Sequence, residues 1–282
     1  MKLIDLHVHS TFSDGELTPL QILAVCKKNG IGVVSITDHE NLIGSKVAIS
    51  NNPYSDITVI PGIELEADYS NGQCHILGYN MSLDNERLNN ITKDIMLDNI
   101  NRIKSLIVLL YEHYKITFKD EDLEFMFSKE GNIGRPEVAK LCIKYGYSET
   151  VESAFKKYLR PLKNKLKQEI KLSHIECIDY IKNAGGLVSL AHPITLKKDD
   201  EELFEYIKML KEHGLDAIEV YHTKHNLEYS NKLITFCNKL DLLQSGGTDY
   251  HGPVVKPNIE IGTGKNGSMK ITQLSILSKI VR

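Results

Sequence analysis

The run LIDLHVHS, residues 3–10, decides how the chain begins to fold. Its apolar residues alternate with polar ones, which predicts a strand over residues 2–8. His7 and His9 stand two positions apart, so on a strand both imidazoles point to the same face. The strand therefore ends in a pair of aligned histidines. The rest of the chain can be tested for similar endings.

The alternation of strands and helices continues after this run. Thr18-Pro19 predicts the start of a helix that reaches about residue 29, because threonine caps helices and proline suits the first turn. Ser70-Asn71-Gly72 is a hairpin-like turn signal between two strand patterns. We expect further strands at residues 30–38, 58–68, 73–79, 187–191, 217–221, 242–245 and 258–261. Repeated strand–helix units are typical of parallel strands joined by crossovers, and in barrels of this type the functional residues lie at the carboxyl ends of the strands.

The middle of the chain differs, because helical patterns follow one another there without a strand-like run. A long pattern covers residues 83–114, and shorter ones cover 119–129, 135–145 and 148–160. We therefore predict a barrel domain formed by residues 1–89 and 166–282. Residues 90–165 are predicted to form a helical insertion domain.

Composition places the chain among ordinary globular proteins. Of its 282 residues, 41% are hydrophobic and 25% are charged, so a sizeable core is available. The net charge of −3 offers no general basic field for nucleic acid. No signal-peptide or membrane-span pattern is found, so we expect a cytoplasmic protein without membrane contact. The five cysteines are scattered, which argues against a disulfide framework or a thiolate zinc site.

Histidine is the unusual residue of this chain. Six of the eleven histidines lie at predicted strand ends, with three carboxylates beside them. Imidazoles and carboxylates without thiolates suit zinc, manganese or iron, and nine ligands exceed the need of one tetrahedral zinc. We expect two or three divalent ions that share a bridging carboxylate. The candidate ligands are His7, His9, Asp14, His39, Glu64, His75, His192, Asp249 and His251.

A single histidine at a strand end is usually an ordinary polar residue, whereas the joint pattern is improbable by accident. Asp5 and Asp38 stand beside ligand positions and either orient imidazoles or pair locally. Arg135 opens a helix, where it either grips an anion or is a solvated residue before proline. His222 is a candidate for substrate contact, and Glu219 is a weaker one.

The motifs resemble those of the PHP (polymerase and histidinol phosphatase) metallophosphoesterase family, in the right order over nearly the whole chain. They are Asp5-Leu6-His7-Val8-His9-Ser10, Ser13-Asp14-Gly15, Thr37-Asp38-His39, Gly62-Ile63-Glu64, His75, Ala191-His192-Pro193 and Gly247-Thr248-Asp249-Tyr250-His251. The resemblance implies an α/β fold, a distorted (β/α)7 TIM-like barrel with its metal cluster at the strand ends.

By the same resemblance, three groups of residues would each hold one ion, with Glu64 as the bridge. Asp14 stands where many relatives have histidine. The groups are His7, His9, Glu64 and Asp249; then Asp14, His39 and His251; then Glu64, His75 and His192.

Within that family the chain is most similar to a branch that acts on nucleotides. This branch includes 3′,5′-nucleoside bisphosphate phosphatases and enzymes that trim short RNA from the 5′ end. The resemblance in residues 134–159 implies that Arg135 contacts a phosphate. Glu137 replaces a histidine of that branch, and a lysine-rich stretch at residues 160–165 replaces a glycine-containing turn.

The expected activity is hydrolysis of a nucleotide phosphate ester, in a 3′,5′-nucleoside bisphosphate or a short 5′-phosphorylated RNA. Hydroxide bridging the ions would attack phosphorus, with Glu64 holding the ions and Arg135 and His222 neutralising the developing charge. Water on an ion, His222 or His192 would protonate the leaving alcohol.

Three alternative functions stay open at this point. A histidinol-phosphate phosphatase would use the same metal site on a smaller substrate. A metal-dependent amidohydrolase would use a similar ligand set, and a phosphate-binding Arg135 would count against it. A non-catalytic PHP module is disfavoured because all nine ligand positions are filled. No stable protein partner is indicated.

Overall fold

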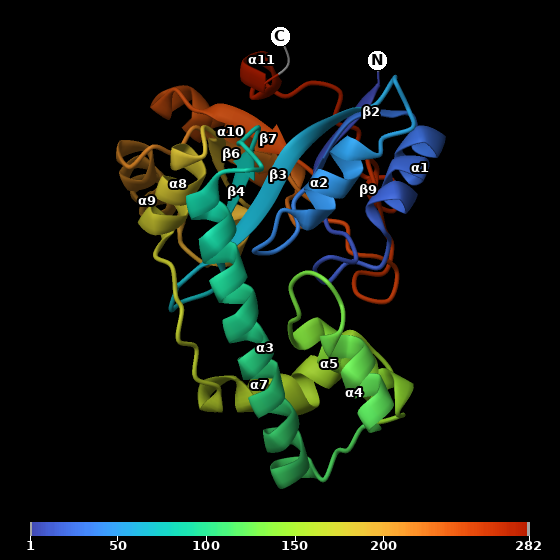
Figure 1. Cartoon of the computed structure of the whole chain (residues 1–282). Coiled ribbons are helices and arrows are strands. Elements are labelled where there is room, and N and C mark those ends of the chain that lie inside the picture. The colour runs from blue at the N-terminus through green and yellow to red at the C-terminus, as the bar shows by residue number, and fades with distance from the viewer. Residues whose placement is uncertain (1, 281–282) are drawn as a thin grey trace.

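A computed structural model gives the fold and describes residues 2–280. One sheet of seven strands runs through the protein, and its strands are neighbours in the order of the sequence (Figure 1). The strands are β1 (Leu3–Val8), β2 (Ile31–Ile36), β3 (Thr58–Ala67), β4 (Cys74–Tyr79), β5 (Leu187–Leu190), β6 (Ala217–Tyr221) and β7 (Leu243–Gly246).

The sheet is mostly parallel, with β4 as the exception. The strands β1, β2 and β3 are parallel, as are β5, β6 and β7, whereas β4 is antiparallel to both of its neighbours. The expected turn at residues 70–72 makes the β3–β4 hairpin. The α/β class is thus confirmed. An isolated bridge joins Val8 of β1 to Tyr250 in the segment after β7, and barrel closure stays a prediction.

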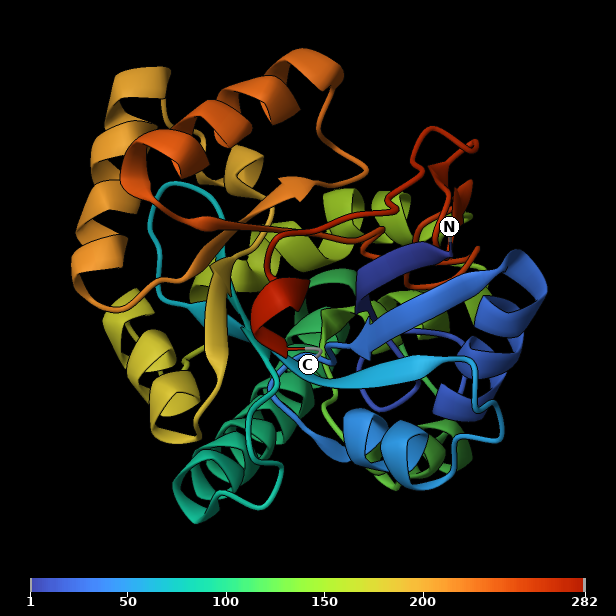
Figure 2. The same ribbon diagram turned by 90° about the horizontal axis from the view of Figure 1, so that it is seen from above.

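Helices pack beside the strands that they connect. Thr18 caps the first of them as expected, since its Oγ1 accepts a hydrogen bond from the backbone N–H of Gln21. These helices are α1 (Pro19–Asn29), α2 (Ile43–Ser50), α8 (His174–Asn183), α9 (Asp200–Glu212) and α10 (Leu227–Leu240). Figure 2 shows α1 and α2 beside β1–β3, and α8, α9 and α10 beside β5–β7.

The stretch between β4 and β5 carries successive helices joined by loops, with no strand between them, as predicted. It contains α3 (Glu86–Tyr114), α4 (Asp120–Phe127), α5 (Arg135–Lys144), α6 (Val151–Ala154), a π-helix η1 (Phe155–Leu159), α7 (Arg160–Leu162) and a 3₁₀-helix η2 (Lys163–Lys165). The helix predicted at 148–160 is a continuous helical run over residues 151–165 that changes between α, π and 3₁₀ geometry. Figure 1 shows α4, α5 and α7 gathered beside the end of α3 that is far from the sheet.

These helices have an apolar core of their own. Ile103, Leu106 and Leu110 of α3 pack with Val138 and Cys142 of α5 and with residues from the segments that follow. That core is a separate cluster from the ones around the sheet. The division into two domains at residues 90 and 165 stays a prediction.

The remaining elements are short. They are a 3₁₀-helix η3 (Pro193–Leu196), β8 (Ile259–Glu260), β9 (Gly264–Lys265) and α11 (Leu277–Ile280). The strand expected at residues 258–261 pairs with β9 and, in the part of the chain that the structure describes, not with the main sheet, so it forms a separate hairpin. Within residues 2–280, no helix has both the length and the apolar character that crossing a bilayer requires.

Candidate active site

All nine side chains predicted as metal ligands meet at the end of the sheet where the parallel strands have their carboxyl ends. They come from β1, β3 and β4 and from the loops that follow β1, β2, β5 and β7. The prediction for His75 was wrong in one respect, because this residue is the second of β4 and not near its carboxyl end. His75 reaches the same end of the sheet because β4 runs antiparallel to β3, which brings the start of β4 beside the end of β3.

Glu64 lies at the centre of the cluster, with its carboxylate almost fully buried among five imidazoles. Its Oε2 is 3.2 Å from His7 Nε2, 3.1 Å from His9 Nε2 and 3.3 Å from His39 Nδ1. Its Oε1 is 2.9 Å from His75 Nδ1 and 3.1 Å from His192 Nε2. One carboxylate thus contacts histidines from β1 and β4 and from the loops that follow β1, β2 and β5.

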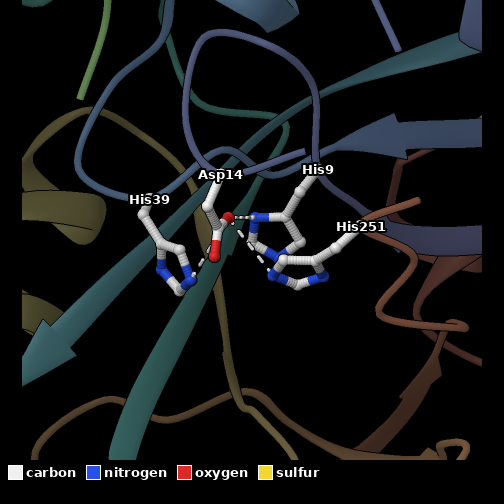
Figure 3. A group of neighbouring side chains, drawn as sticks. All are labelled: His9, Asp14, His39 and His251. Carbon is white, nitrogen blue, oxygen red and sulfur yellow. Dashed lines mark ion pairs between the residues drawn. The ribbon is translucent and has the colours of Figure 1, made fainter. Parts of the chain in front are cut away.

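Two further carboxylates complete the cluster on the side of His9 and His251. Asp249 Oδ1 is 3.3 Å from His9 Nε2 and 3.4 Å from His251 Nδ1. Asp14 Oδ1 is 3.2 Å from His251 Nε2, 3.7 Å from His9 Nδ1 and 4.0 Å from His39 Nε2. Figure 3 shows the imidazoles of His9, His39 and His251 around the Asp14 carboxylate.

The electrostatics of the cluster keep its carboxylates ionised. Burial by itself raises the pKa of Glu64, yet the surrounding imidazoles hold that pKa well below its usual value. Burial also acts to raise the pKa of Asp249, and Lys256 with His7 lowers it well below the usual range. Burial lowers the pKa of His192 to about 3, so this imidazole is neutral.

The cluster leaves buried polar atoms without hydrogen-bond partners. Among residues 2–280, the unpaired atoms of this cluster are His7 Nε2, His9 Nε2, Asp14 Oδ1, Glu64 Oε2 and His75 Nε2. Such atoms are costly to bury unless something satisfies them. A divalent cation would accept electron pairs from all of these atoms, so the residues present fit metal ions.

The possible coordination groups overlap the predicted sets without reproducing them. In each group the ligand atoms lie within 4.8 Å of one another. His9 joins Asp14, His39 and His251 here, and His39 joins Glu64 and His75. The groups are His9, Asp14, His39 and His251; His7, His9 and Asp249; His7, Glu64 and His192; and His39, Glu64 and His75.

Residues behind the ligands have roles that the sequence left open. Glu219 is fully buried, and its Oε1 lies 2.8 Å from His7 Nδ1, so it contacts a ligand candidate rather than the cavity. Asp38 accepts hydrogen bonds from Ser10 and from the Ser13 hydroxyl, and Asp5 accepts them from backbone N–H groups and Thr248. Both aspartates therefore fasten loops, and Asp38 is connected to His9 through the Ser13 hydroxyl, which lies 3.5 Å from His9 Nδ1.

A cavity of about 300 Å³ opens between the cluster and the helices of the middle stretch. His39, His75 and Asp249 line it on one side, and Arg102 and Arg135 line it on the other. The Arg135 guanidinium lies over the Phe155 ring, 5.5 Å from its centroid. Burial lowers the pKa of Arg135, and the nearby guanidinium groups of Arg102 and Arg160 add to this effect.

His222, the other residue expected to touch substrate, lies deeper. It is buried, with Nε2 3.2 Å from Asp249 Oδ2 and Nδ1 accepting the backbone N–H of Lys224. It is not among the residues that line the cavity. Its contact with substrate stays a prediction, and the structure places it directly behind Asp249.

A series of side-chain hydrogen bonds, which the sequence analysis missed, connects the helices to the cluster. Arg102 Nη1 donates to Asn99, Asn99 donates to Asn132, and Asn132 donates to the Glu40 carboxylate, with distances of 2.9, 2.9 and 2.7 Å. Glu40 follows His39 directly, so this hydrogen-bond series ends beside a ligand candidate. Lys256 was missed too, and it pairs with Asp249. No motif marks these residues, and Asn132 is 33 residues from Asn99 and 92 residues from Glu40.

The fold and the site together define an α/β protein whose buried histidine–carboxylate cluster suits divalent metal ions. The sequence profile of the PHP domain matches residues 5–220. The chain belongs to the PHP domain family.

Similar proteins cover nearly the whole chain. The 5′-3′ exoribonuclease Rnm of Escherichia coli is 27% identical, over 92% of this chain and 88% of its own length. The 3′,5′-nucleoside bisphosphate phosphatase of Chromobacterium violaceum is 25% identical, over 90% and 88%. A phosphoribosyl 1,2-cyclic phosphate 1,2-diphosphodiesterase of Eggerthella lenta is 28% identical, over 88% and 94%.

A solved structure agrees with these relatives. It is that of a Bifidobacterium adolescentis protein described as a metal-dependent phosphoesterase. Its TM-score is 0.80 at 26% identity, and the match covers 95% of this chain and 94% of that one. The predicted enzyme class, a metal-dependent phosphoric ester hydrolase, is thereby confirmed.

Proposed function

We propose that the protein hydrolyses a phosphate ester of a nucleotide, either a 3′,5′-nucleoside bisphosphate or a short 5′-phosphorylated RNA. The observation that carries the proposal is the Glu64 carboxylate, which contacts five imidazoles beside a cavity whose far wall carries two arginines. A metal cluster and guanidinium groups on opposite walls suit a substrate with more than one anionic group.

The nine residues of the cluster would hold two or three divalent ions, for which manganese, zinc and iron are the candidates. Bound there, the ions supply Lewis acidity and lower the pKa of water, which phosphate-ester hydrolysis at neutral pH requires. Glu64 is the proposed bridge, because its two oxygens contact different sets of imidazoles. Glu219 and Thr195 orient His7 and His192 through their outer nitrogens.

The arginine wall would bind a second phosphate of the substrate. The Arg102 Nε is buried and unpaired, and within residues 2–280 Arg135 has no carboxylate oxygen within 4.0 Å. The carboxylate of Glu66 acts on Arg135 to raise its pKa. The wall thus has guanidinium donors free for an anion, and a phosphate oxygen would match their geometry.

The proposed orientation of His192 argues against this residue as the proton donor. His192 Nδ1 lies 3.0 Å from the Thr195 hydroxyl, which leaves Nε2 with its lone pair toward Glu64 and the cluster. A nitrogen in that state suits a metal ligand and has no proton to give. His222 or solvent remains for protonation of the leaving alcohol.

The test is release of phosphate from adenosine 3′,5′-bisphosphate by protein treated with chelator and then supplied with manganese. Adenosine 3′-phosphate, adenosine 5′-phosphate and histidinol phosphate are the comparison substrates, and short 5′-phosphorylated RNA is the second candidate. We expect metal-dependent release from the bisphosphate or the RNA. Cleavage of histidinol phosphate alone would leave the metal site but overturn the nucleotide substrate, and inertness toward all of these substrates would overturn the proposal.

Arg135→Ala tests the arginine wall. We expect KM for the bisphosphate to rise about tenfold or more, because a charge-assisted contact is lost, while bound metal is unchanged. Arg87→Ala is the matched control, since this exposed arginine pairs with Asp179 far from the cavity. An unchanged KM in Arg135→Ala would remove Arg135 from the substrate site.

A further inference from the structure

A cluster of positive charge lies in the helical stretch, on a chain whose net charge is −3. We call residues 156–167 the basic segment. Between Glu152 and Glu169 the sequence has no acidic residue, whereas the basic segment has six cationic ones: Lys156, Lys157, Arg160, Lys163, Lys165 and Lys167. All six are exposed. The segment is therefore a local positive surface that the overall charge conceals.

Most of these cations have no protein partner. Over residues 2–280, no carboxylate oxygen lies within 4.0 Å of the side-chain nitrogens of Lys156, Lys157, Arg160 or Lys163. Lys167 pairs with Glu169, and Lys165 lies 2.8 Å from His113 Nε2. Unpaired like charges close together repel one another, and a polyanion would relieve that repulsion.

The basic segment is continuous with the cavity. Phe155, directly before it, and Leu166, within it, line the cavity, so the segment turns its apolar side inward and its charges outward. Arg160 is close enough to Arg135 to influence that guanidinium. Positive charge thus extends from the arginine wall of the cavity onto the surface.

The segment begins in a π-helix, at Phe155–Leu159. Such turns are rare and are often found at functional sites. Lys156, Arg160 and Lys163 follow at spacings of four and three residues, which places them along one side of the helical turns. This arrangement presents a row of cations and not a scattered set.

Aromatic rings lie next to these cations. The rings of Tyr158 and Tyr114 pack edge to face, with centroids 5.2 Å apart, and Tyr114 is 37% exposed. His113, beside Tyr114, contacts Lys165. Cations that follow a backbone and exposed rings on which bases stack are the two elements of single-strand binding surfaces.

We propose that the basic segment binds the sugar–phosphate backbone of a single-stranded oligonucleotide whose terminal nucleotide occupies the cavity. The inference rests on the proposed function and narrows it, because a mononucleoside bisphosphate has no further phosphates to reach this surface. It favours short RNA over free bisphosphates as the better substrate. Charge complementarity and continuity with the cavity support a nucleic-acid strand over an acidic protein.

Binding is tested first, with EDTA-treated protein and a 3′-fluorescein, 5′-phosphorylated oligoadenylate of six nucleotides. The variant is K156Q/K157Q/K163Q. The matched control is K28Q/K265Q/K270Q, which removes equal charge from three exposed lysines outside the basic segment and the cavity lining. Fluorescence anisotropy gives Kd between about 50 and about 200 mM salt, a range over which phosphate contacts weaken strongly.

We expect the basic-segment variant to bind roughly tenfold more weakly at the lowest salt, with a log Kd–log salt slope reduced by about 2, as three single-strand contacts imply. The control variant should bind as the wild type does. Equal losses in both variants, or no loss in either, would overturn the proposal. Equally strong binding of an acidic peptide of the same charge would assign the surface to a protein and overturn it as well.

Kinetics separate this inference from the proposed function. The quantity is the ratio of kcat/KM for the hexanucleotide to kcat/KM for adenosine 3′,5′-bisphosphate, measured with manganese. We expect the ratio to exceed one in the wild type and to fall about tenfold only in the basic-segment variant. A ratio that is equal in all three proteins overturns the basic segment's role and leaves the proposed function standing. If the wild-type protein hydrolyses neither the hexanucleotide nor adenosine 3′,5′-bisphosphate, the proposed function itself is overturned.

Discussion

The carboxylate of Glu219 lies directly behind the imidazole of His7, with Oε1 2.8 Å from His7 Nδ1 and both side chains fully buried. The other oxygen of the same carboxylate accepts the backbone N–H of His192 at 2.6 Å. Glu219 therefore fixes one ligand candidate by its ring and another by its backbone. It does so from β6, a strand that contributes no ligand candidate itself.

Glu219→Gln should weaken metal binding by about tenfold to a hundredfold, the usual cost of removing an outer partner of a metal-ligating histidine. The amide cannot provide the negative charge that raises the basicity of His7. Manganese titration of chelator-treated protein measures the effect. Glu205→Gln is the control, since Glu205 pairs with Lys208 on the surface. Unchanged affinity in Glu219→Gln would show that His7 is held without it.

The strands and the ligand candidates could be predicted because both are written locally. Histidine pairs such as His7 and His9 reveal their common face by spacing alone, and turn residues such as Asn71 and Gly72 mark the hairpin. Short crossovers account for the order of β1, β2 and β3 and of β5, β6 and β7, whereas β4 and β5 are neighbours across the whole helical stretch. These features depend on neighbours in the sequence, so one chain suffices to read them.

The contact of Glu219 with His7, and the position of Asn132, were beyond this kind of reasoning. Glu219 stands 212 residues from His7, and nothing in its own neighbourhood distinguishes it from a polar residue on a strand. Asn132 lies in a loop whose course depends on how the helices pack against the sheet. The grouping of His39 with Glu64 and His75 also depends on the antiparallel direction of β4. That direction brings His75 close to Glu64 in space, and the local sequence does not specify it.

Glu64→Gln should remove more than one equivalent of bound metal and lower activity by more than about a hundredfold, beyond the effect of an outer partner. The reason is that both oxygens of Glu64 contact imidazoles, so the loss of charge reaches every group that shares it. Metal content by elemental analysis and phosphate release under saturating manganese give the two readouts. Loss of a single equivalent would assign Glu64 to one ion and end the bridging proposal.

Asn132→Ala should separate the helical stretch from the metal cluster. The substitution leaves the buried Glu40 carboxylate without its 2.7 Å hydrogen bond and costs about 1–3 kcal/mol of stability. We also expect KM to rise, because Arg102 loses its indirect connection to the loop after His39. Urea unfolding and steady-state kinetics measure both changes. Asn101→Ala, at an exposed position on α3, is the control. If Asn132→Ala loses no more stability than Asn101→Ala, the proposed role of the hydrogen-bond series is refuted.

The pH dependence of folding should reveal His222. Burial lowers the pKa of His222 to about 3, whereas the unfolded chain has the ordinary value near 6.5. Above pH 6.5 both states are neutral, and His222 makes no pH-dependent contribution. As the pH falls below 6.5, the unfolded state binds a proton that the folded state does not, so the free energy of unfolding falls by about 1.4 kcal/mol per pH unit from this residue.

His222→Gln should remove that contribution, because the amide can accept the Lys224 N–H or contact Asp249 without titrating. Chelator-treated wild type and variant are unfolded with urea at several pH values from about 6 to about 4.5, the window in which His222 is charged only when unfolded. The slope of unfolding free energy against pH should be shallower in the variant by about 1.4 kcal/mol per unit. Parallel slopes would mean that His222 takes up its proton in the folded protein too.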